Sequence, residues 1–466
     1  MAALVVAEIV STFEGSMIYS ALPAFYRMYD DPAAIGWIIT AFMLVGSAAT
    51  AICGRLGDLF GRKRLLIFVL GMSAFGSLVS AATDHLGVII AGRALQGFAG
   101  AILPLCYGIV REYMPKTSVP VNIGIIAATA SGGAGTGFIL GGIISDFGRW
   151  EYIFIVSAMV AVLAILLVAV LIPASRQPKR TGQVDWIGGV LFVPGLILLL
   201  YALSVGEEQG WASPEVIGSL LAGIVILVIW VLHERHHTDP MIDIRLLAHR
   251  QIGLALLIVS IVAIGAMNIG QIVMVMLQQP AATGVGIGVS ATLAGTLHAP
   301  GSVMGVIAGP LCGWFAARRG SRKATILATS ILTMAWVGLL FFHHSAWILA
   351  VWMAVNGFAM GAIFAAVPNL IVEVAPADRT SEATGLAQIV RKITMGVGAQ
   401  LIAITLATST VTVEGGGAFP SGQAYALTYS WVAVACAIAV FLSFLLPKQQ
   451  VLYDAATARR PNHAHA

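Results

Sequence analysis

The feature that most constrains this chain is a series of long apolar runs with almost no charge inside them. A helix needs roughly 20 apolar residues to cross a bilayer core about 30 Å thick, and fourteen runs of about that length follow one another. Only 10% of the residues are charged and 59% are hydrophobic, whereas a soluble domain is roughly 25% charged. The sequence predicts an all-α integral membrane protein with 14 transmembrane helices, and it excludes a soluble enzyme, a nucleic-acid binder and a disordered scaffold. The expected spans are 3–26, 33–54, 65–83, 86–110, 121–144, 152–173, 186–205, 215–233, 251–278, 290–316, 324–343, 346–372, 383–409 and 427–446.

Lysine and arginine residues gather at alternate loops between these runs. Short cytoplasmic loops accumulate such cations, and with the N-terminus inside, 20 of the 25 fall in inside segments and two in outside segments. The other three, Arg93, Arg391 and Lys392, lie within spans. An odd number of spans would disrupt this alternation. We therefore expect a multi-pass protein of the plasma (inner) membrane with both termini cytoplasmic.

A loop after the second run recurs after the tenth run, 259 residues later. The first copy is Gly54-Arg-Leu-Gly-Asp58-Leu-Phe-Gly61-Arg62-Lys63-Arg64, and the second spans 313–323 with Ala317 in place of the aspartate. Parallel repeats of this kind occur in secondary transporters. The offset predicts two bundles of six helices with two helices inserted between them (6 + 2 + 6), as an N-terminal bundle in 1-175, an insertion in 176-245 and a C-terminal bundle with a short tail in 246-466.

Two further motifs accompany this loop. Gly92-Arg93-Ala-Leu-Gln96-Gly97 places an arginine inside the fourth span, where a charge is costly and marks a functional or ion-paired group. In the fifth span, glycines at 133, 137 and 141 recur every four residues and permit close helix packing. With the loop at 54–64, these motifs resemble the major facilitator superfamily, specifically its fourteen-helix drug:proton antiporter branch of multidrug efflux type.

The resemblance implies roles for these residues. It makes the first loop a latch that holds the two halves in the outward-facing state, and it links Arg93 to proton transfer, the alternative being a structural arginine. It also makes the fifth span the antiporter helix, although Phe138 stands where the family has proline, so the expected kink is missing. The implied latch residues are Gly54, Asp58, Gly61, Arg62 and Lys63, and those of the antiporter helix are Gly133, Gly137, Gly141 and Gly142.

Two spans carry the charges expected to couple protons to transport. Glu14 takes the place of an aspartate in the branch's first-helix motif, near the bilayer midplane where transporter sites lie. An ionised carboxylate is costly there, so the site favours a bound proton. Arg391, in the thirteenth span, is expected to pair with Glu14 or to meet an anionic group of the cargo; otherwise it snorkels with Lys392 to the inner surface. Glu8 is interpreted as an interfacial charge rather than a second coupling site.

Polar groups inside other spans are candidates for the substrate cavity, although interhelical hydrogen bonding is the alternative for most of them. His233, His236 and His237 form a cluster in an inner loop that we interpret as solvated rather than zinc-binding, and no metal site is expected. The candidate cavity residues are Tyr19, Gln96, Asn268, Gln271, His298, Asn356 and Lys392.

The sequence favours a proton-coupled antiporter that exports amphipathic small molecules by alternating access, as a monomer in the lipid bilayer. It has no phosphate-binding Gly-rich loop and no hydrolase motif, so we expect no enzyme activity and no cofactor, with the proton gradient as the energy source. Two alternatives stay open. One is a dedicated transporter of a lipid, siderophore or metabolite, including anionic cargo or import; the other is a receptor or scaffold without transport.

Overall fold

The computed structural model describes residues 1–18, 25, 28–29, 32–146, 149–173, 185–237, 249–289, 291–412 and 418–447, and almost all of them are helical. A helix, in places interrupted by a tighter turn, lies on each of the fourteen expected ranges. The first eight ranges hold α1 (Ala2–Ser16), α3 (Pro32–Phe60), α4 (Arg62–Ala81), α5 (Leu86–Gln96) continued through η1 (Gly97–Ala101) into α6 (Ile102–Tyr113), α7 (Val119–Asp146), α8 (Glu151–Leu171), α9 (Trp186–Gln209) and α10 (Pro214–His236).

The other six ranges form the second half of the chain. They hold α12 (Arg250–Ile264) continued through η2 (Ala266–Asn268) into α13 (Ile269–Gln278), α14 (Ala291–Arg319), α15 (Ser321–Phe341), α16 (Ala346–Val374), α17 (Thr380–Ala407) after the short η4 (Ala377–Arg379), and α18 (Gly422–Phe444). Within the described residues, eleven helical segments are long and apolar enough to cross a membrane. The described helices on the first, fifth and seventh ranges, α1, α7 and α9, are not among those eleven.

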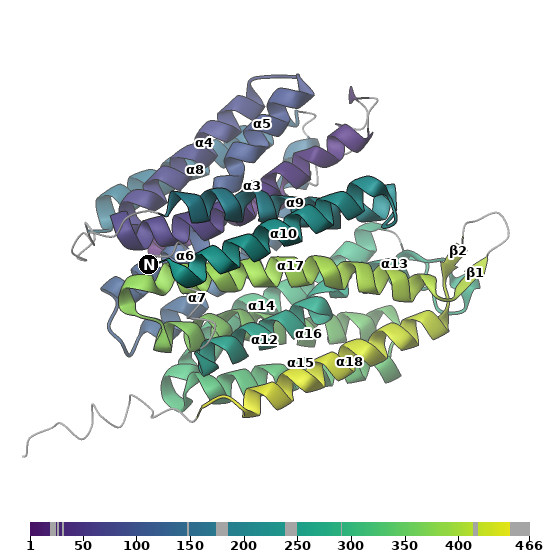
Figure 1. Cartoon of the computed structure of the whole chain (residues 1–466). Coiled ribbons are helices and arrows are strands. Elements are labelled where there is room, and N and C mark those ends of the chain that lie inside the picture. The colour runs from purple at the N-terminus through teal and green to yellow at the C-terminus, as the bar shows by residue number, and fades with distance from the viewer. Residues whose placement is uncertain are drawn as a thin grey trace, which may run out of the picture.

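The helices run side by side in two groups, with α9 and α10 between them (Figure 1). We call α1–α8 the N-terminal group, α12–α18 the C-terminal group, and α9 with α10 the inserted hairpin. In the N-terminal group α4 packs on α5 and α8, and α1 packs on α7 and α8. In the C-terminal group α14 packs on α16, and α15 on α16 and α18. The inserted hairpin contacts both α3 and α17, so it touches a helix of each group.

The two groups meet most closely where α7 crosses α14. A β-carbon added at Gly124 would lie 2.3 Å from the carbonyl oxygen of Gly309, and one added at Gly309 would lie 2.5 Å from that of Gly124. Neither position can carry a side chain at this backbone spacing, which is the close helix approach that small residues permit in membranes. Part of the high glycine content therefore serves the contact between the groups.

The connection between α17 and α18 includes β-structure. Two short strands, β1 (Thr410–Thr412) and β2 (Ala418–Pro420), pair antiparallel between α17 and α18, with Val411 opposite Phe419. Figure 1 shows this pair at the opposite end of the molecule from the N-terminus. Over the described ranges, the regular structure is thus helical apart from this one strand pair.

Candidate transport cavity and latch

A cavity of about 580 Å³ lies between the two groups. Residues of α1, α3, α6 and α7 line one side, and residues of α12, α14, α16 and α17 line the other. The volume lies within the range of small-molecule sites, roughly 300–1,000 Å³. Much of the wall is apolar, with Met267, Met353 and Met360 among the lining residues, and methionine adapts to ligands of irregular shape.

Among the described residues, three with charged side chains line this cavity: Glu8 from α1 and the adjacent Arg391 and Lys392 from α17. Arg391 is near enough to Glu8 and to the phenol of Tyr107, which also lines the cavity, for its charge to influence both. Arg391 additionally lies over the ring of Phe364, 4.8 Å from its centroid. The cavity wall therefore contains a carboxyl group from the N-terminal group and two basic side chains from the C-terminal group.

The position of Glu8 corrects the interpretation of this residue as an interfacial charge. Its side chain is only 2% exposed, because α6, α7 and α8 pack around α1. Among the described residues, Glu8 Oε2 has no hydrogen-bond partner. Its place six residues before Glu14 suggested a surface location, but the neighbouring helices close over this turn of α1.

Glu14 lies away from the cavity, inside the N-terminal group. Its Oε1 accepts hydrogen bonds from Ser73 Oγ at 2.6 Å and from Ser77 Oγ at 3.0 Å, both on α4. Its Oε2 has no hydrogen-bond partner among the described residues. Arg93 donates to the backbone oxygen of Glu14 at 3.0 Å and to Gln96 Oε1 at 2.7 Å. Glu14 and Arg93 thus share one buried polar cluster, and Arg391 lies instead beside Glu8.

The other candidate cavity residues divide into two sets. His298 and Asn356 line the cavity, and Asn356 Oδ1 accepts a hydrogen bond from Trp336 Nε1 at 3.0 Å. Gln96 does not line it, because its amide nitrogen donates to Ser77 within the Glu14 cluster. Asn268 and Gln271 also lie outside the lining and donate to the carbonyls of Met395 and Ala399 on α17. Tyr19 lies outside the described residues.

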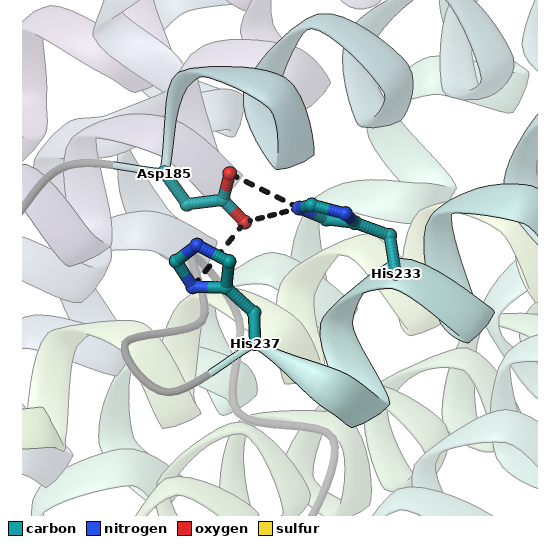
Figure 2. Close-up of side chains that lie close together, drawn as sticks. All are labelled: Asp185, His233 and His237. Carbon is teal, nitrogen blue, oxygen red and sulfur yellow. Dashed lines mark hydrogen bonds and ion pairs between the residues drawn. The ribbon is translucent and has the colours of Figure 1, made fainter.

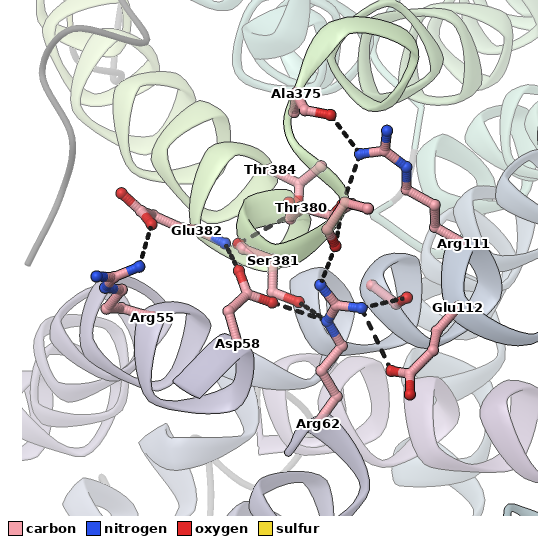
Figure 3. Close-up of polar contacts among 12 residues, drawn as sticks. Arg55, Asp58, Arg62, Arg111, Glu112, Ala375, Thr380, Ser381, Glu382 and Thr384 are labelled. Carbon is pink, nitrogen blue, oxygen red and sulfur yellow. Dashed lines mark hydrogen bonds and ion pairs between the residues drawn. The ribbon is translucent and has the colours of Figure 1, made fainter. Parts of the chain in front are cut away.

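A polar network closes the contact between the two groups at the junction of α3 and α4 with α17 (Figure 3). Arg62 Nε donates to Asp58 Oδ1 at 2.7 Å and to Ser381 Oγ at 3.1 Å, and its Nη2 donates to the carbonyl of Ala377 at 2.7 Å. The backbone N–H of Glu382 donates to Asp58 Oδ2 at 3.0 Å. Asp58 therefore caps the N-terminus of α17, where the helix macrodipole favours an anion. We call this network the latch.

Two further arginines extend the latch, Arg55 from the repeated loop itself and Arg111 from α6. Arg55 Nη1 lies 3.3 Å from Glu382 Oε2, and both side chains are buried. Arg111, at the end of α6, donates to the carbonyl of Ala375 at 2.6 Å and to Thr380 Oγ1 at 2.7 Å. The sequence marked both arginines only as loop cations. Their spacing from Asp58 gave no indication that they reach the other half of the chain.

The remaining motif residues serve the latch unequally. A β-carbon at Gly54 would lie 2.9 Å from the carbonyl oxygen of Ser381, so this glycine lets α3 and α17 touch. Gly61 has φ 104° at the junction of α3 and α4, a conformation that favours glycine. Lys63 was expected in the latch, but it donates to the carbonyls of Ala169 and Ile172 at the end of α8, within its own group.

The glycines of the fifth span pack α7 against α1. A β-carbon at Gly133 would lie 2.1 Å from Thr12 Oγ1, and one at Gly137 would lie 1.9 Å from Ser16 Oγ. Gly141 and Gly142 lie further along the same helix. The α7 helix runs unbroken through position 138, in agreement with the absence of proline there.

The second copy of the repeated loop makes a simpler contact with the other group. A β-carbon at Gly313 would lie 2.4 Å from the carbonyl oxygen of Pro120 on α7, the counterpart of the approach at Gly54. Asn369 Nδ2 donates to the same oxygen at 3.3 Å. Ala317 offers no carboxylate, so helix capping of the kind made by Asp58 is absent at this position.

The sequence profile described as Major Facilitator Superfamily matches residues 4–399 and, in a second match, 259–458. The chain belongs to the major facilitator superfamily. It is therefore a multi-pass membrane protein and secondary transporter of a small-molecule substrate, and it is not an enzyme.

Proteins named for different substrates are similar in sequence to this chain. The chain is 29% identical over 463 residues to a uridine/deoxyuridine transporter of Lactococcus lactis subsp. cremoris, covering 96% of this chain and 94% of that protein. It is 32% identical over 267 residues to the puromycin resistance protein pur8 of Streptomyces alboniger, covering 56% of this chain and 52% of that protein. The structure of the proton:xylose symporter XylE aligns with a TM-score of 0.65 at 13% identity, covering 96% of this chain and 94% of XylE. At that identity the likeness shows the major facilitator fold alone.

Proposed function

We propose that the protein is a proton-coupled antiporter that exports amphipathic small molecules by alternating access. Fourteen helices span the plasma (inner) membrane, with both termini cytoplasmic, and the chain works as a monomer. Residues 1-175 and 246-466 rock against each other around the cavity, and the inserted segment 176-245, which contains the inserted hairpin, accompanies them. The similarity to a puromycin resistance protein and the mixed apolar and charged cavity wall support this assignment.

One observation carries the proposal: the charged cavity and the latch both lie between the N-terminal and C-terminal groups. Glu8, Arg391 and Lys392 face the cavity, while Asp58 and Arg62 fasten α3 and α4 to α17. Since α17 supplies both the cavity cations and the helix end that Asp58 caps, movement of α17 during latch opening also moves Arg391 and Lys392. Access and binding are thereby coupled through one helix.

In the proposed cycle the buried Glu14 cluster holds the transported proton. Glu14 Oε1 accepts from two serine hydroxyls, while Oε2 has no hydrogen-bond partner among the described residues. An ionised carboxylate with one oxygen left unbonded is costly inside a bilayer, and this favours a bound proton. Deprotonated Glu14 supports cargo binding from the cytoplasm, and protonation from outside lowers that affinity. Arg93 tunes the cluster through its bonds to Gln96 and to the Glu14 backbone.

The test is flux in proteoliposomes with an imposed pH gradient, over a panel of cationic, neutral and anionic amphipathic compounds. The proposal expects export of at least one compound class that depends on the gradient and collapses with a proton ionophore. Flux that ignores the gradient for every transported compound would refute proton coupling. Binding without flux for the whole panel would favour a receptor or scaffold.

A second candidate is a transporter dedicated to a nucleoside or to another polar or anionic metabolite, for export or import. Two observations favour it: adjacent cations, Arg391 and Lys392, lie in the cavity, and the relative aligned over 96% of this chain is a uridine/deoxyuridine transporter. Uridine and an anionic metabolite therefore belong in the same panel. Flux restricted to those compounds would replace multidrug export with this function.

A further inference from the structure

The inserted hairpin brings two histidines and an aspartate together at one end (Figure 2). Asp185 directly precedes α9, while His233 lies in the last turn of α10 and His237 follows it. His233 Nε2 lies 3.0 Å from Asp185 Oδ2, and His237 Nδ1 lies 4.0 Å from the same oxygen. The three ligand atoms all lie within 4.8 Å of one another. The histidines form a visible cluster in the sequence, but no local pattern pairs them with an aspartate 48 residues before His233.

We infer that Asp185, His233 and His237 form a binding site for Zn²⁺ or a similar divalent transition-metal ion. Zinc binds histidine nitrogen and carboxylate oxygen at about 2.0–2.2 Å, which at tetrahedral angles places ligand atoms about 3.3–3.5 Å apart. The observed separations of 3.0 and 4.0 Å bracket that value. The 4.0 Å separation is too long for a hydrogen bond, yet it suits two ligands of one ion.

The surroundings orient the aspartate as a ligand. Asp185 is buried, and its Oδ1 accepts a hydrogen bond from the backbone N–H of Gly188 at 2.8 Å as it caps α9. This bond holds the carboxylate in place, as partners outside the ligand set do in metal sites. His233 Nε2 lies 3.2 Å from Oδ1 and 3.0 Å from Oδ2. The two histidine side chains are partly exposed, at 24% and 33%, so an ion has a path from water.

A second acidic group adds negative charge beside the site. A β-carbon at Gly188 would lie 2.5 Å from Asp185 Oδ2 and 2.7 Å from Glu234 Oε1, so both carboxyl groups approach this glycine. Glu234 Oε1 also accepts a hydrogen bond from Trp230 Nε1 at 3.0 Å. Two neutral imidazoles with nearby carboxylates select a transition metal over Mg²⁺ or Ca²⁺, which prefer oxygen ligands. Three protein ligands leave the fourth zinc position for water.

The site would fasten the two ends of the hairpin to each other. Asp185 is the N-cap of α9 and His237 is the C-cap of α10, so a bound ion would link the start of α9 to the end of α10. The hairpin contacts α3 and α17, one helix of each group. The inference requires no particular cargo and stands independently of the proposed export.

Zinc binding to the purified chain in detergent tests the site. The full chain carries His463→Ala and His465→Ala and a purification tag free of histidine, so that the C-terminal histidines do not bind the ion. Competition with a zinc-sensitive chromophore should give one ion per chain. Asp185→Asn and His233→Asn should each weaken binding by at least about tenfold, and Co²⁺ should give the intense visible absorption of a tetrahedral site.

His236→Ala is the matched control, because His236 is exposed and its Nδ1 bonds the carbonyl of Leu232. It should bind zinc as the parent chain does. Size-exclusion profiles and thermal unfolding without metal identify variants that fold. No zinc binding by the parent chain, or equal affinity in folded Asp185→Asn and His233→Asn, would overturn the inference.

Discussion

The latch and the cavity use buried charge in opposite ways. In the latch the charges are paired: Asp58 accepts from Arg62 and from the N-terminus of α17, and Arg55 meets Glu382 through Nη1, although Arg55 Nη2 has no hydrogen-bond partner among the described residues. In the cavity, Glu8 Oε2 lacks a hydrogen-bond partner among the described residues, and Arg391 and Lys392 lie side by side. Paired charges stabilise one position of α17 relative to α3 and α4. Charged groups without a full set of partners can still form favourable contacts with an incoming ligand or proton.

This difference assigns separable effects to the two regions. Changes in the cavity should reduce binding and flux while leaving the latch closed. Changes in the latch should shift the conformational equilibrium while leaving the cavity able to bind.

Arg391→Ala should have the largest effect on transport. It removes the buried cation whose charge influences Glu8. Truncating one member of a buried, hydrogen-bonded charge pair costs about 2–5 kcal/mol, and we expect a cost near the low end because the described residues show no direct ion pair between Arg391 and Glu8. We expect flux in proteoliposomes to fall by about 100-fold. Thr394→Val is the control, since this hydroxyl bonds the carbonyls of Val390 and Arg391 on its own helix. Unchanged flux in Arg391→Ala would remove the cavity cation from the mechanism.

Asp58→Ala should open the latch. Breaking a buried pair leaves an uncompensated charge at a cost of about 3–5 kcal/mol, so the latch-open population should rise by at least about tenfold. Spin labels on Lys116→Cys and Ala377→Cys, one in each group, would report this as a longer interspin distance. The four native cysteines are buried, which slows their labelling.

Lys63→Ala is the matched control for the latch. Lys63 lies in the same loop, but its described bonds go to α8 in its own group. The interspin distance should stay as in the parent chain. The latch assignment would fail if both variants, or neither, changed the distance.

Gly54→Val should weaken the latch by less. The new side chain would press on the carbonyl of Ser381, where a β-carbon alone would lie at 2.9 Å, and overpacking costs about 1–3 kcal/mol. The same spin-label distances should broaden toward the open state. Gly71→Val on α4 is the control, because a β-carbon there meets nothing within 4 Å; a similar shift in both would show general destabilisation of the bundle.

Ser77→Ala should have the smallest effect. It removes the hydroxyl that donates to Glu14 and accepts from Gln96, at about 1 kcal/mol per bond. We expect proton-driven flux to fall roughly fivefold. Ser80→Ala, one turn further along, loses only a bond to the carbonyl of Ile89 and should change flux less. Equal effects of the two changes would argue against a special Glu14 cluster.

Periodicity and charge placement predicted the helices well, because each depends on residues close together in sequence. The latch residues Gly54, Asp58 and Arg62 were also named, since the motif at 54–64 is continuous. Its partners Ser381 and Glu382 belong to the other half of the chain, and no local pattern joins them to Asp58. The sequence therefore indicated one side of the latch and left the other unknown.

The cavity was harder to predict because residue type does not reveal which face of a helix a group occupies. Gln96 and Glu8 show the difficulty in opposite directions. Gln96 was expected to line the cavity but bonds within the Glu14 cluster, whereas Glu8 was placed at the surface but faces the cavity. Packing of α6, α7 and α8 around α1 decides the second case, and this depends on contacts distant in sequence.

The most direct test of the account compares two assays of Glu14→Gln in proteoliposomes. The account predicts that substrate exchange at equal pH persists at a reduced rate. The cavity lining of Glu8, Arg391 and Lys392 is intact, while the neutral glutamine imitates protonated Glu14, which supports cargo binding less well. It predicts that accumulation driven by a pH gradient is lost, because the proton-carrying acid is gone. Full gradient-driven accumulation in Glu14→Gln would contradict the assignment of this residue as the site of proton coupling.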